Sequence, residues 1–339
     1  MRVVLADPPA FTPPYDHALA SALARAGAEV ELVTSRFRFG DVPEPDGYRR
    51  SELFYPLSSR LFRRSRLRLP LKAMEHPLGI ALLAARPADV VHVQWLAWPQ
   101  LDDRLLRLRA PSVFTAHDLL PRRTAGKRKL WRRLLDRFDR VVVHSERGRK
   151  TLAELGVEAW VIPHPVFRSD PPRADDGGTV LFFGIIRPYR GLDDAIAAAR
   201  KAGARLIVAG DPAMPVERAE GVDWRLGWLS EQEVDRAHGE ATVAVFPYRP
   251  ELDQSGSLLR ALGAGVPAVV YDVGGLAEPV RRYGAGLVVP PGDVAGLAEA
   301  LRRVLDDPEP FRAGAERART ELTWDAAAAA HLALYRELV

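Results

Sequence analysis

The 339-residue sequence contains no cysteine, which excludes disulfides, thiolate zinc sites, iron–sulfur clusters and a cysteine nucleophile. It also lacks an apolar run close to the roughly 18 residues that a membrane-spanning helix needs. Asp7 interrupts the N-terminal apolar run too early for a signal peptide. Lysine is scarce, because 43 of the 48 basic residues are arginine. We therefore expect a cytoplasmic protein without a membrane span, in which a single arginine is weak evidence of phosphate binding.

The remaining composition is that of a globular protein, with 47% hydrophobic and 27% charged residues, and this excludes wholesale disorder. At about 150 residues per domain, the length predicts two domains. The formal charge of +4 is unevenly distributed: residues 1–165 carry 28 basic and 18 acidic side chains, and residues 166–339 carry 20 and 26. A composition bias explains the arginine content but not this asymmetry.

Short Val-rich segments alternate with helical segments in both halves, which predicts parallel, doubly wound α/β sheets with helices on both faces. Proline, glycine and charge near residues 163–178 indicate a domain boundary. We predict strands at residues 2–6, 29–34, 89–93, 112–116, 140–144, 159–163, 180–184, 205–209, 242–246 and 267–271. We predict helices at residues 16–26, 80–85, 127–139, 146–155, 192–202, 257–263, 294–305, 308–322 and 324–338, and a capping box at Ser230 and Glu233. Two such domains facing each other leave a cleft at the carboxyl ends of their strands, where ligands usually bind.

An arginine-containing loop follows the predicted strand at residues 180–184. Its sequence, GIIRPYRG, presents Arg187 and Arg190 before the next helix. Two guanidiniums at this position can hold a diphosphate bidentately and stay charged while a leaving group gains negative charge. Two solvated arginines in an arginine-rich chain are the alternative, and position alone does not separate the two interpretations.

A second anion-binding candidate is the start of the helix near residue 257. Gln254, Ser255 and Gly256 precede it, and its first backbone N–H groups and the Ser255 and Ser257 hydroxyls suit an anion. The alternative is a simple serine N-cap. GAGVPA at residues 263–268 matches a dinucleotide pattern but lies before a strand rather than after one. There is no P-loop, zinc-type histidine cluster or Asp-x-Asp motif, so we predict no metal site.

The first half contributes His117, which ends a predicted strand beside Asp118. A neutral histidine there can donate to a hydroxyl or an oxyanion, with Asp118 orienting it. We expect His92, His144 and His164, on or near strands, to have packing roles. Residues 8–15 are predicted to form a loop where a substrate can also bind.

Two stretches are strongly basic. Residues 60–72 interleave arginine with leucine and phenylalanine, and we expect either peripheral contact with an anionic membrane or a solvated surface there. Residues 122–137 also contain many basic side chains, but Trp131, Leu134 and Leu135 have helical spacing, which favours an ordinary helix packed on the sheet. No nucleic-acid-binding motif accompanies the charge, so we predict no nucleic acid partner.

Several segments together resemble the family 4 glycosyltransferases, which are retaining, nucleotide-sugar-dependent enzymes of the GT-B fold. FFGIIRPYRG at residues 182–191 resembles their donor loop, with Arg190 at the lysine position, and TAHD at 115–118 resembles their acceptor-side histidine motif. The other similar segments are LGWLSEQEV at 226–234, QSG at 254–256, AGVP at 264–267, GGLAE at 274–278 and the interdomain VIPHPV at 161–166.

The resemblance implies two Rossmann-like domains facing a cleft, with an acceptor domain at residues 1–165, a donor domain at 166–322 and a helix at 323–339 that crosses back to the first. It implies transfer of a sugar from a nucleotide diphosphate sugar to a glycan, lipid or small molecule, with no metal or other cofactor. The implied catalytic residues are His117, Asp118, Arg187 and Arg190. The implied donor-binding residues are Gly184, Gly227, Trp228, Ser255, Gly256, Ser257 and Glu278, and the acceptor side comprises Pro8, Tyr15 and Trp95.

The sequence departs from the family pattern at three places. Many members carry two glutamates eight positions apart, the second contacting ribose, but Leu252 and Arg260 stand here, with Glu251 or Asp253 as substitutes for the first. Proline-rich residues 8–14 replace a glycine pair, and Ile185 replaces an arginine, for which Arg187 substitutes. Two alternatives therefore stay open: a non-catalytic nucleotide-sugar-binding or membrane-associated partner protein, and a GT-B epimerase or phosphorylase.

Overall fold

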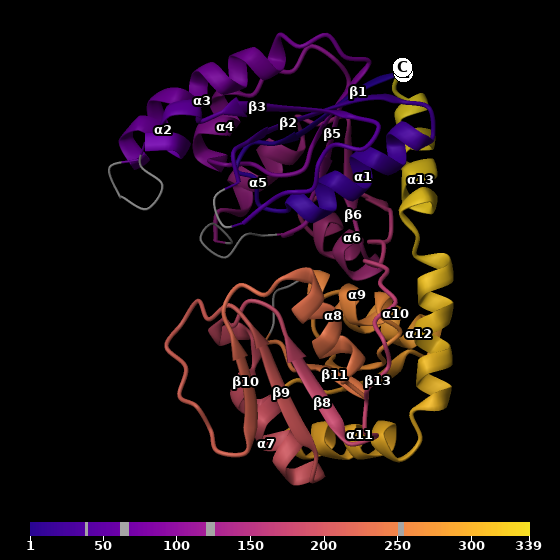
Figure 1. Cartoon of the computed structure of the whole chain (residues 1–339). Coiled ribbons are helices and arrows are strands. Elements are labelled where there is room, and N and C mark those ends of the chain that lie inside the picture. The colour runs from indigo at the N-terminus through magenta and orange to yellow at the C-terminus, as the bar shows by residue number, and fades with distance from the viewer. Residues whose placement is uncertain (38–39, 62–67, 120–125, 250–253) are drawn as a thin grey trace. The chain divides into compact units, whose positions relative to one another are not determined.

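The computed structural model describes residues 1–37, 40–61, 68–119, 126–249 and 254–339. The chain forms two compact units (Figure 1): Met1–Pro163 together with Trp324–Val339, called unit 1, and His164–Thr323, called unit 2. Each unit is built around one sheet whose strand pairs are all parallel. The predicted α/β class with two doubly wound sheets is therefore confirmed. Within the described ranges, no helix has the length and apolarity to span a bilayer.

The sheet of unit 1 has seven strands in the order β3-β2-β1-β4-β5-β6-β7. Six of them were predicted, with both ends correct to within two residues, because they are short, apolar and buried. The exception is the edge strand β3, whose sequence RRSELF carries three charges and is only partly buried. The strands are β1 (Arg2–Asp7), β2 (Glu29–Ser35), β3 (Arg49–Phe54), β4 (Val90–Val93), β5 (Ser112–Thr115), β6 (Arg140–Val143) and β7 (Trp160–Val161).

Seven helices surround this sheet within the described residues of unit 1. They are α1 (Pro13–Arg25), α2 (Pro56–Leu61), α3 (Arg68–Ala84), α4 (Pro99–Leu105), α5 (Arg128–Leu135), α6 (Glu146–Ala153) and α13 (Trp324–Arg336). Helix α13 packs on α1, where Arg25 and Asp325 form an ion pair of 2.7 Å. The predicted loop at residues 8–15 is wrong in its last part, because α1 already begins at Pro13. Proline at the first helical positions has the φ angle that a helix needs and no amide to leave unsatisfied.

The apolar positions of the second basic stretch are inside unit 1. Trp131, Leu134 and Leu135 are buried, and Phe138 stacks on Phe114 at 5.1 Å between ring centroids. The interpretation of this stretch as a helix with its apolar side buried is confirmed for Arg128–Leu135, which is shorter than the predicted helix at residues 127–139. The basic residues at 120–125 lie outside the described residues.

The sheet of unit 2 has six strands in the order β10-β9-β8-β11-β12-β13. They are β8 (Thr179–Phe183), β9 (Arg205–Gly210), β10 (Val222–Leu226), β11 (Val243–Phe246), β12 (Ala268–Tyr271) and β13 (Gly286–Val289). The helical elements are η1 (Pro188–Arg190), α7 (Leu192–Ala202), α8 (Glu231–Gly239), α9 (Gly256–Gly263), α10 (Ala277–Tyr283), α11 (Val294–Asp306) and α12 (Glu309–Glu321). The predicted capping box of α8 is present, with Ser230 and Glu233 each bonded to the other's backbone.

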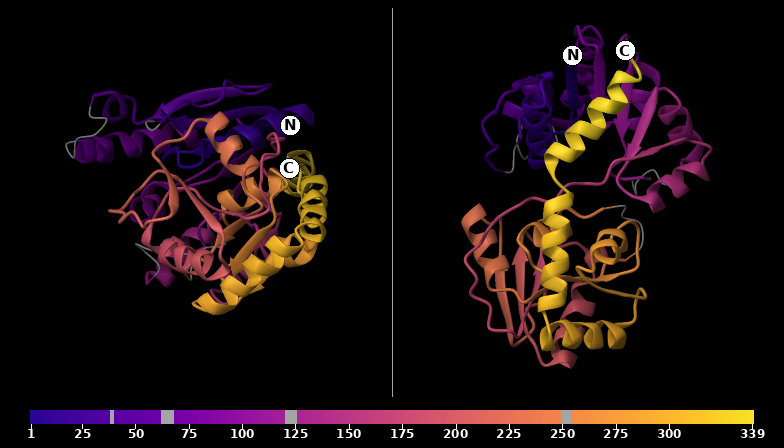
Figure 2. Two further views of the ribbon diagram at one scale, coloured as in Figure 1. Left: turned by 60° about the horizontal axis from the view of Figure 1, so that its bottom comes forward. Right: turned by 90° about the vertical axis from the view of Figure 1, so that its right-hand side faces the viewer.

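The helices of unit 2 pack on its sheet as the alternation predicts. Helices α7 and α11 lie side by side against the strands, and α12 packs on α9 and α10 (Figure 2). The core is formed mainly by the buried strands β8, β9, β11 and β12. Because the strands are parallel, their carboxyl ends, and the loops that follow them, lie along one edge of the sheet.

Candidate functional site

Three glycines lie along the carboxyl edge of the unit 2 sheet. Gly184 follows β8, Gly210 ends β9 and Gly227 follows β10, with φ angles of 118°, 141° and 128°. The Gly184 amide donates to the Ala209 carbonyl at 2.9 Å, and the Gly227 amide donates to the Gly210 carbonyl at 3.1 Å. A Cβ atom on Gly210 would lie 2.1 Å from the Gly184 carbonyl oxygen, whereas one on Gly227 would meet nothing within 4 Å. The side chains of Arg190 and Ser257 fill the space beside Gly184, so a ligand can approach the backbone closely at Gly227.

Arg190 is built into this edge. Its Nη1 donates to the Ser257 hydroxyl at 2.9 Å and to the Phe183 carbonyl at 3.2 Å, and its guanidinium carbon lies 5.0 Å from the centroid of the Tyr248 ring. Its Nε is buried and has no hydrogen-bond partner among the described residues. These contacts hold a positive charge against Gly184, and the Nε–H group of Arg190 is left as a donor without an acceptor in the described part of the chain.

Arg187 has different surroundings from Arg190, although the sequence alone predicts the same role for the two. It is exposed at the start of η1, and its guanidinium has no hydrogen bond or ion pair with the described part of the chain. Arg187 is therefore solvated in this structure, whereas Arg190 is held in place by hydrogen bonds. A catalytic role for Arg187 stays a prediction.

The start of α9 lies beside Arg190, because the Ser257 hydroxyl accepts a hydrogen bond from the Arg190 guanidinium. Ser255 and Ser257 have different partners. Ser255 is an N-cap, as the simpler interpretation predicted: its hydroxyl accepts from the Leu258 amide at 3.3 Å and lies 3.1 Å from the Tyr248 hydroxyl. Ser257 instead accepts from Arg190. The Gly256 and Ser257 amides belong to the first turn, which has no intrahelical acceptors. An anion beside Arg190 would therefore meet these two amides rather than the Ser255 hydroxyl.

The remaining predicted donor-side residues surround this edge. Trp228 follows Gly227 and is 57% exposed, which is high for a tryptophan. Glu278 is half-buried in the first turn of α10. The Gln254 side chain donates to the Gly275 carbonyl at 3.3 Å and so connects the start of α9 to the loop before α10.

Arg260 stands where many family members have the second glutamate, and it is engaged elsewhere. Its Nη1 pairs with the Glu231 carboxylate of α8 at 2.5 Å, and its guanidinium carbon lies 5.6 Å from the Phe167 ring centroid. Leu252 and its proposed substitutes Glu251 and Asp253 lie outside the described residues. Position 260 therefore has no carboxylate, and its guanidinium is engaged in an internal ion pair.

In unit 1 the predicted residues His117, Tyr15 and Trp95 come together. The His117 ring stacks on Trp95 with centroids 5.1 Å apart, and Tyr15 meets it edge-on at 4.6 Å. Trp95 donates to the Thr12 hydroxyl at 2.8 Å. Pro8 and Tyr15 are buried, so Trp95 and His117 are the more accessible members of this group.

Two partners of His117 were missed. Its Nε2 lies 2.9 Å from the side chain of Gln94, and its Nδ1 lies 3.2 Å from Nε2 of His144. Gln94 follows β4 and His144 follows β6, so both occupy the carboxyl-end position that singled out His117 after β5. That shared position was the available signal. The orienting role predicted for Asp118 stays a prediction.

Two buried carboxyl groups hold the loop between β1 and α1. The Asp7 carboxylate ends β1 and accepts from the amides of Phe11 at 2.7 Å and Thr12 at 3.2 Å. Asp16, on α1, is also buried. Burial, and then the charge of Asp7, raise the pKa of Asp16 well above its ordinary value, and burial also raises the pKa of Asp7. The folded pair is therefore most stable when the two carboxyl groups share one proton between them.

Replacing Asp16 by Asn should stabilise unit 1 at pH 8. A raised folded-state pKa contributes stability that is present at low pH and is lost as the pH rises through that pKa. Asparagine cannot ionise and still donates a hydrogen bond, so the advantage of Asp16→Asn should shrink toward pH 4. Melting temperatures at several pH values measure it, at about 3 °C per kcal/mol. The exposed Asp136→Asn is the control, and a pH-independent loss of stability in Asp16→Asn would contradict the interpretation.

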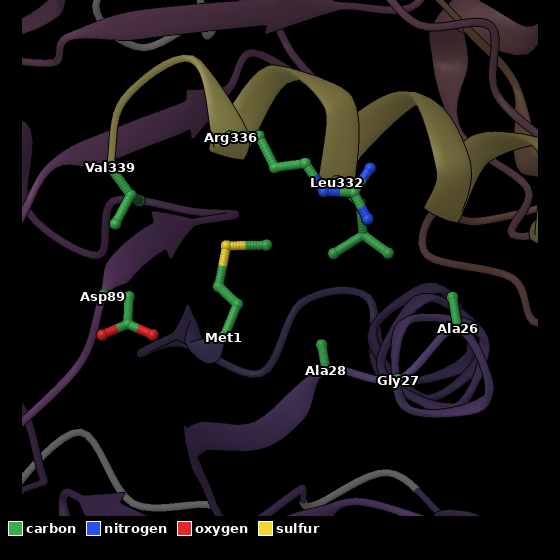
Figure 3. Close-up of a pocket in the computed structure, with 8 residues that line it drawn as sticks. All are labelled: Met1, Ala26, Gly27, Ala28, Asp89, Leu332, Arg336 and Val339. Carbon is green, nitrogen blue, oxygen red and sulfur yellow. The ribbon is translucent and has the colours of Figure 1, made fainter.

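The hollow shown in Figure 3 is not the candidate site. It has a volume of about 340 Å³ and is lined by Met1, Ala26, Gly27, Ala28, Asp89, Leu332, Arg336 and Val339. Met1 precedes β1 and Asp89 precedes β4, so it lies at the amino edge of the unit 1 sheet, opposite to His117. Ligands of doubly wound sheets bind at the carboxyl edge.

Both halves of the chain match known families. Residues 15–168 match "Glycosyltransferase Family 4", and residues 177–307 match "Glycosyl transferases group 1". The chain is 30% identical over 299 residues to the 2-deoxystreptamine glucosyltransferase of Streptomyces kanamyceticus, with 78% of this chain and 73% of that protein covered. It is also 30% identical over 175 residues to a GDP-mannose:glycolipid 4-beta-D-mannosyltransferase of Xanthomonas campestris, where the match spans about half of each protein (47% and 49%).

The fold likewise matches a solved structure. The sucrose-phosphate synthase of Thermosynechococcus elongatus superimposes with a TM-score of 0.75 over 100% of this chain and 99% of that one, at 20% identity. An identity this low shows the fold alone. Together with the two family matches, the two parallel sheets and the glycine and arginine residues at the carboxyl edge of β8, these relationships show that the chain belongs to glycosyltransferase family 4 and has the GT-B fold.

Proposed function

We propose that this protein transfers a sugar from a nucleotide diphosphate sugar to an acceptor, with the donor on unit 2 and the acceptor on unit 1. The observation that carries the proposal is Arg190. Its guanidinium is held by Ser257, Phe183 and Tyr248 against Gly184, at the carboxyl edge of β8. A fixed cation there stabilises the diphosphate as it leaves, because it needs no reorganisation when the charge develops.

On unit 2, the diphosphate would contact Arg190 and the first amides of α9, with Arg187 approaching from the exposed side of the loop. The backbone around Gly227 and Trp228 would hold the base, and Glu278 would lie on the donor side. Because the cations come from the protein, we expect transfer to need no metal and no other cofactor. Full activity after exhaustive chelation supports this expectation, and restoration of activity only by a divalent cation opposes it.

On unit 1, the acceptor would lie near Trp95 and His117, with Pro8, Tyr15 and Asp118 supporting that surface. The acceptor is a glycan, a lipid-linked sugar or a small molecule. We expect retention at the anomeric carbon. The bond from that carbon to the diphosphate breaks, the bond to the acceptor oxygen forms on the same face, and a donor phosphate oxygen takes the acceptor proton. NMR of the first product formed distinguishes retention from inversion.

A binding screen tests the proposal at its first step. Purified protein is heated with UDP-, GDP-, ADP- and TDP-sugars and with the free nucleotides, and a ligand that binds only the folded state raises its melting temperature. We expect stabilisation by one base and not by the others. No stabilisation by any of them would contradict the proposal. Binding without turnover over a broad acceptor panel would favour a nucleotide-sugar-binding protein, and turnover without an acceptor would favour an epimerase.

Peripheral membrane contact is a second proposal, supported by helix α3. Its residues Met74, Leu78 and Leu82 recur every four positions and are 77%, 64% and 44% exposed, and Leu69 and Leu57 are exposed nearby in sequence. Within the described residues, Met74, Leu78 and Leu82 form an exposed apolar face on α3, and Leu57 belongs to α2. Arg60 is exposed next to them in sequence, and the basic residues at 62–67 lie outside the described residues. An apolar face flanked by basic residues suits an anionic lipid surface.

The protein should float with anionic vesicles at low salt and less at high salt, because screening weakens the basic contribution. The double variant Met74→Ser/Leu78→Ser should reduce binding at least about tenfold, since each buried side chain of this size contributes about 1.5–3 kcal/mol. The control is Arg303→Ser, at an exposed position on α11 of unit 2. Flotation that neither salt nor the double variant changes would contradict membrane contact through this face.

A further inference from the structure

The ring hydrogens of two histidines in unit 1 can be assigned from their acceptors. His144 Nδ1 lies 2.9 Å from the Ile162 carbonyl oxygen. A carbonyl oxygen only accepts, so Nδ1 of His144 must carry a hydrogen. His144 is 3% exposed, and burial lowers its pKa to about 4. Near neutral pH its other nitrogen, Nε2, therefore has no hydrogen and is an acceptor.

This assignment determines the state of His117. Its Nδ1 lies 3.2 Å from the acceptor nitrogen of His144. Two nitrogens without hydrogens would repel each other, so Nδ1 of His117 must donate. In the neutral ring Nε2 then carries a lone pair. The Trp95 ring stacked on His117 and the Tyr15 ring edge-on to it oppose rotation of the imidazole.

Gln94 meets this lone pair. Its side chain is fully buried, and its Oε1 lies 2.9 Å from His117 Nε2, whereas its amide nitrogen has no hydrogen-bond partner among the described residues. An oxygen that faces an unprotonated nitrogen makes no hydrogen bond. Exchanging the two ends of the amide, which have nearly the same shape, places the NH2 group on His117 and satisfies both groups. With its NH2 group on His117, Gln94 completes a chain of three hydrogen bonds. Gln94 donates to His117, His117 donates to His144, and His144 donates to the Ile162 carbonyl oxygen.

We propose that His144 and Gln94 are positioning residues that hold His117 in the tautomer with its hydrogen on Nδ1, so that Nε2 is an acceptor. A substrate hydroxyl that replaces the Gln94 NH2 group at this nitrogen donates to it, which is the reverse of the donation expected from the sequence. The tautomer follows from the hydrogen-bond chain in which the NH2 group of Gln94 faces His117. Its consequence for a sugar hydroxyl rests on the proposed function.

Nitrogen NMR of protein with 15N-labelled histidine rings tests the tautomer without any substrate, because protonated and unprotonated ring nitrogens have well-separated resonances. His117→Gln identifies the His117 signals by their loss. At neutral pH we expect an unprotonated Nε2 and a protonated Nδ1. A protonated Nε2 in the wild-type protein, in either the other tautomer or the imidazolium, would overturn the proposal.

Two variants at position 144 separate positioning from packing. His144→Phe keeps an aromatic ring but removes the acceptor, so His117 should populate both tautomers. His144→Gln should restore the wild-type tautomer, because one glutamine amide can donate to Ile162 and accept from His117. Wild-type signals in His144→Phe would overturn the role of His144. Gln94→Glu serves where His144→Phe does not fold: a carboxylate only accepts, so both His117 nitrogens should become protonated, and an unchanged Nε2 would overturn the role of Gln94.

Turnover with the donor found by the binding screen gives the second readout. His144→Phe should lower kcat at least about tenfold with little change in KM for the donor, and His144→Gln should recover most of the loss. Equal losses in His144→Phe and His144→Gln, with the tautomer restored only in the latter, would overturn the functional part. A confirmed tautomer in a protein without any turnover would instead count against the proposed function and leave the tautomer standing.

Discussion

Arg190→Ala should lower the transfer rate at least tenfold, a loss of about 1.4 kcal/mol of transition-state stabilisation. In unit 2 this guanidinium is held by the Ser257 hydroxyl at 2.9 Å and the Phe183 carbonyl at 3.2 Å, at the carboxyl edge of β8 where we propose that the diphosphate binds. The charge that it balances grows as the bond to the sugar breaks, so kcat should fall more than KM rises. Steady-state kinetics with the donor identified by the binding screen measure both.

Arg190→Lys makes the test sharper. Lysine keeps the charge but loses the planar fork that reaches the Ser257 hydroxyl and a ligand at once, so its rate should lie between those of the wild type and Arg190→Ala. Arg303→Ala is the matched control, because Arg303 is exposed on α11, away from the carboxyl edge of the sheet. Near-wild-type turnover in Arg190→Ala, or an equal loss in the control, would exclude the role given to Arg190.

The second large effect is expected at Gly210. Gly210→Ala should destabilise unit 2 by about 3 kcal/mol. Its φ angle of 141° is rarely adopted by residues with a side chain, and its Cβ would lie 2.1 Å from the Gly184 carbonyl oxygen. The atoms that this Cβ would meet all belong to the Gly184 backbone and cannot turn aside, so β8 and β9 would have to separate. Denaturant unfolding combined with hydrogen exchange of the β8 and β9 amides measures the loss.

Gly203→Ala separates backbone strain from collision. Gly203 ends α7 with a φ angle of 71°, and a Cβ there would meet nothing within 4 Å. Only the left-handed conformation is penalised, by about 1 kcal/mol. If Gly210→Ala cost no more than Gly203→Ala, the close approach of β8 and β9 at the proposed ligand surface would be wrong.

The path of the chain could be predicted wherever local pattern and burial agree. The buried Val-rich strands were found because buried parallel strands are continuously apolar. The edge strands β3 and β10 were missed for the same reason, since RRSELF and VDWRL carry charges and are only partly covered. Helices α2, α4 and α10 were also missed, and α3 was predicted only over its last part. Helix α1 was placed three residues too late, because consecutive prolines were taken as a loop rather than as the first helical positions.

By itself the sequence determined the α/β class and the positions of Arg190 and His117 at the ends of strands, because the alternation of apolar and helical segments is a local property. Only the tertiary structure distinguished the surroundings of Arg187 and Arg190, since the hydrogen bond that holds Arg190 comes from Ser257, 67 positions away. It alone also brought Gln94 and His144 to His117, from strands that neighbour β5 in the sheet. A hydrogen-bond partner is chosen by distance in space, and a parallel sheet brings together residues that are far apart in sequence.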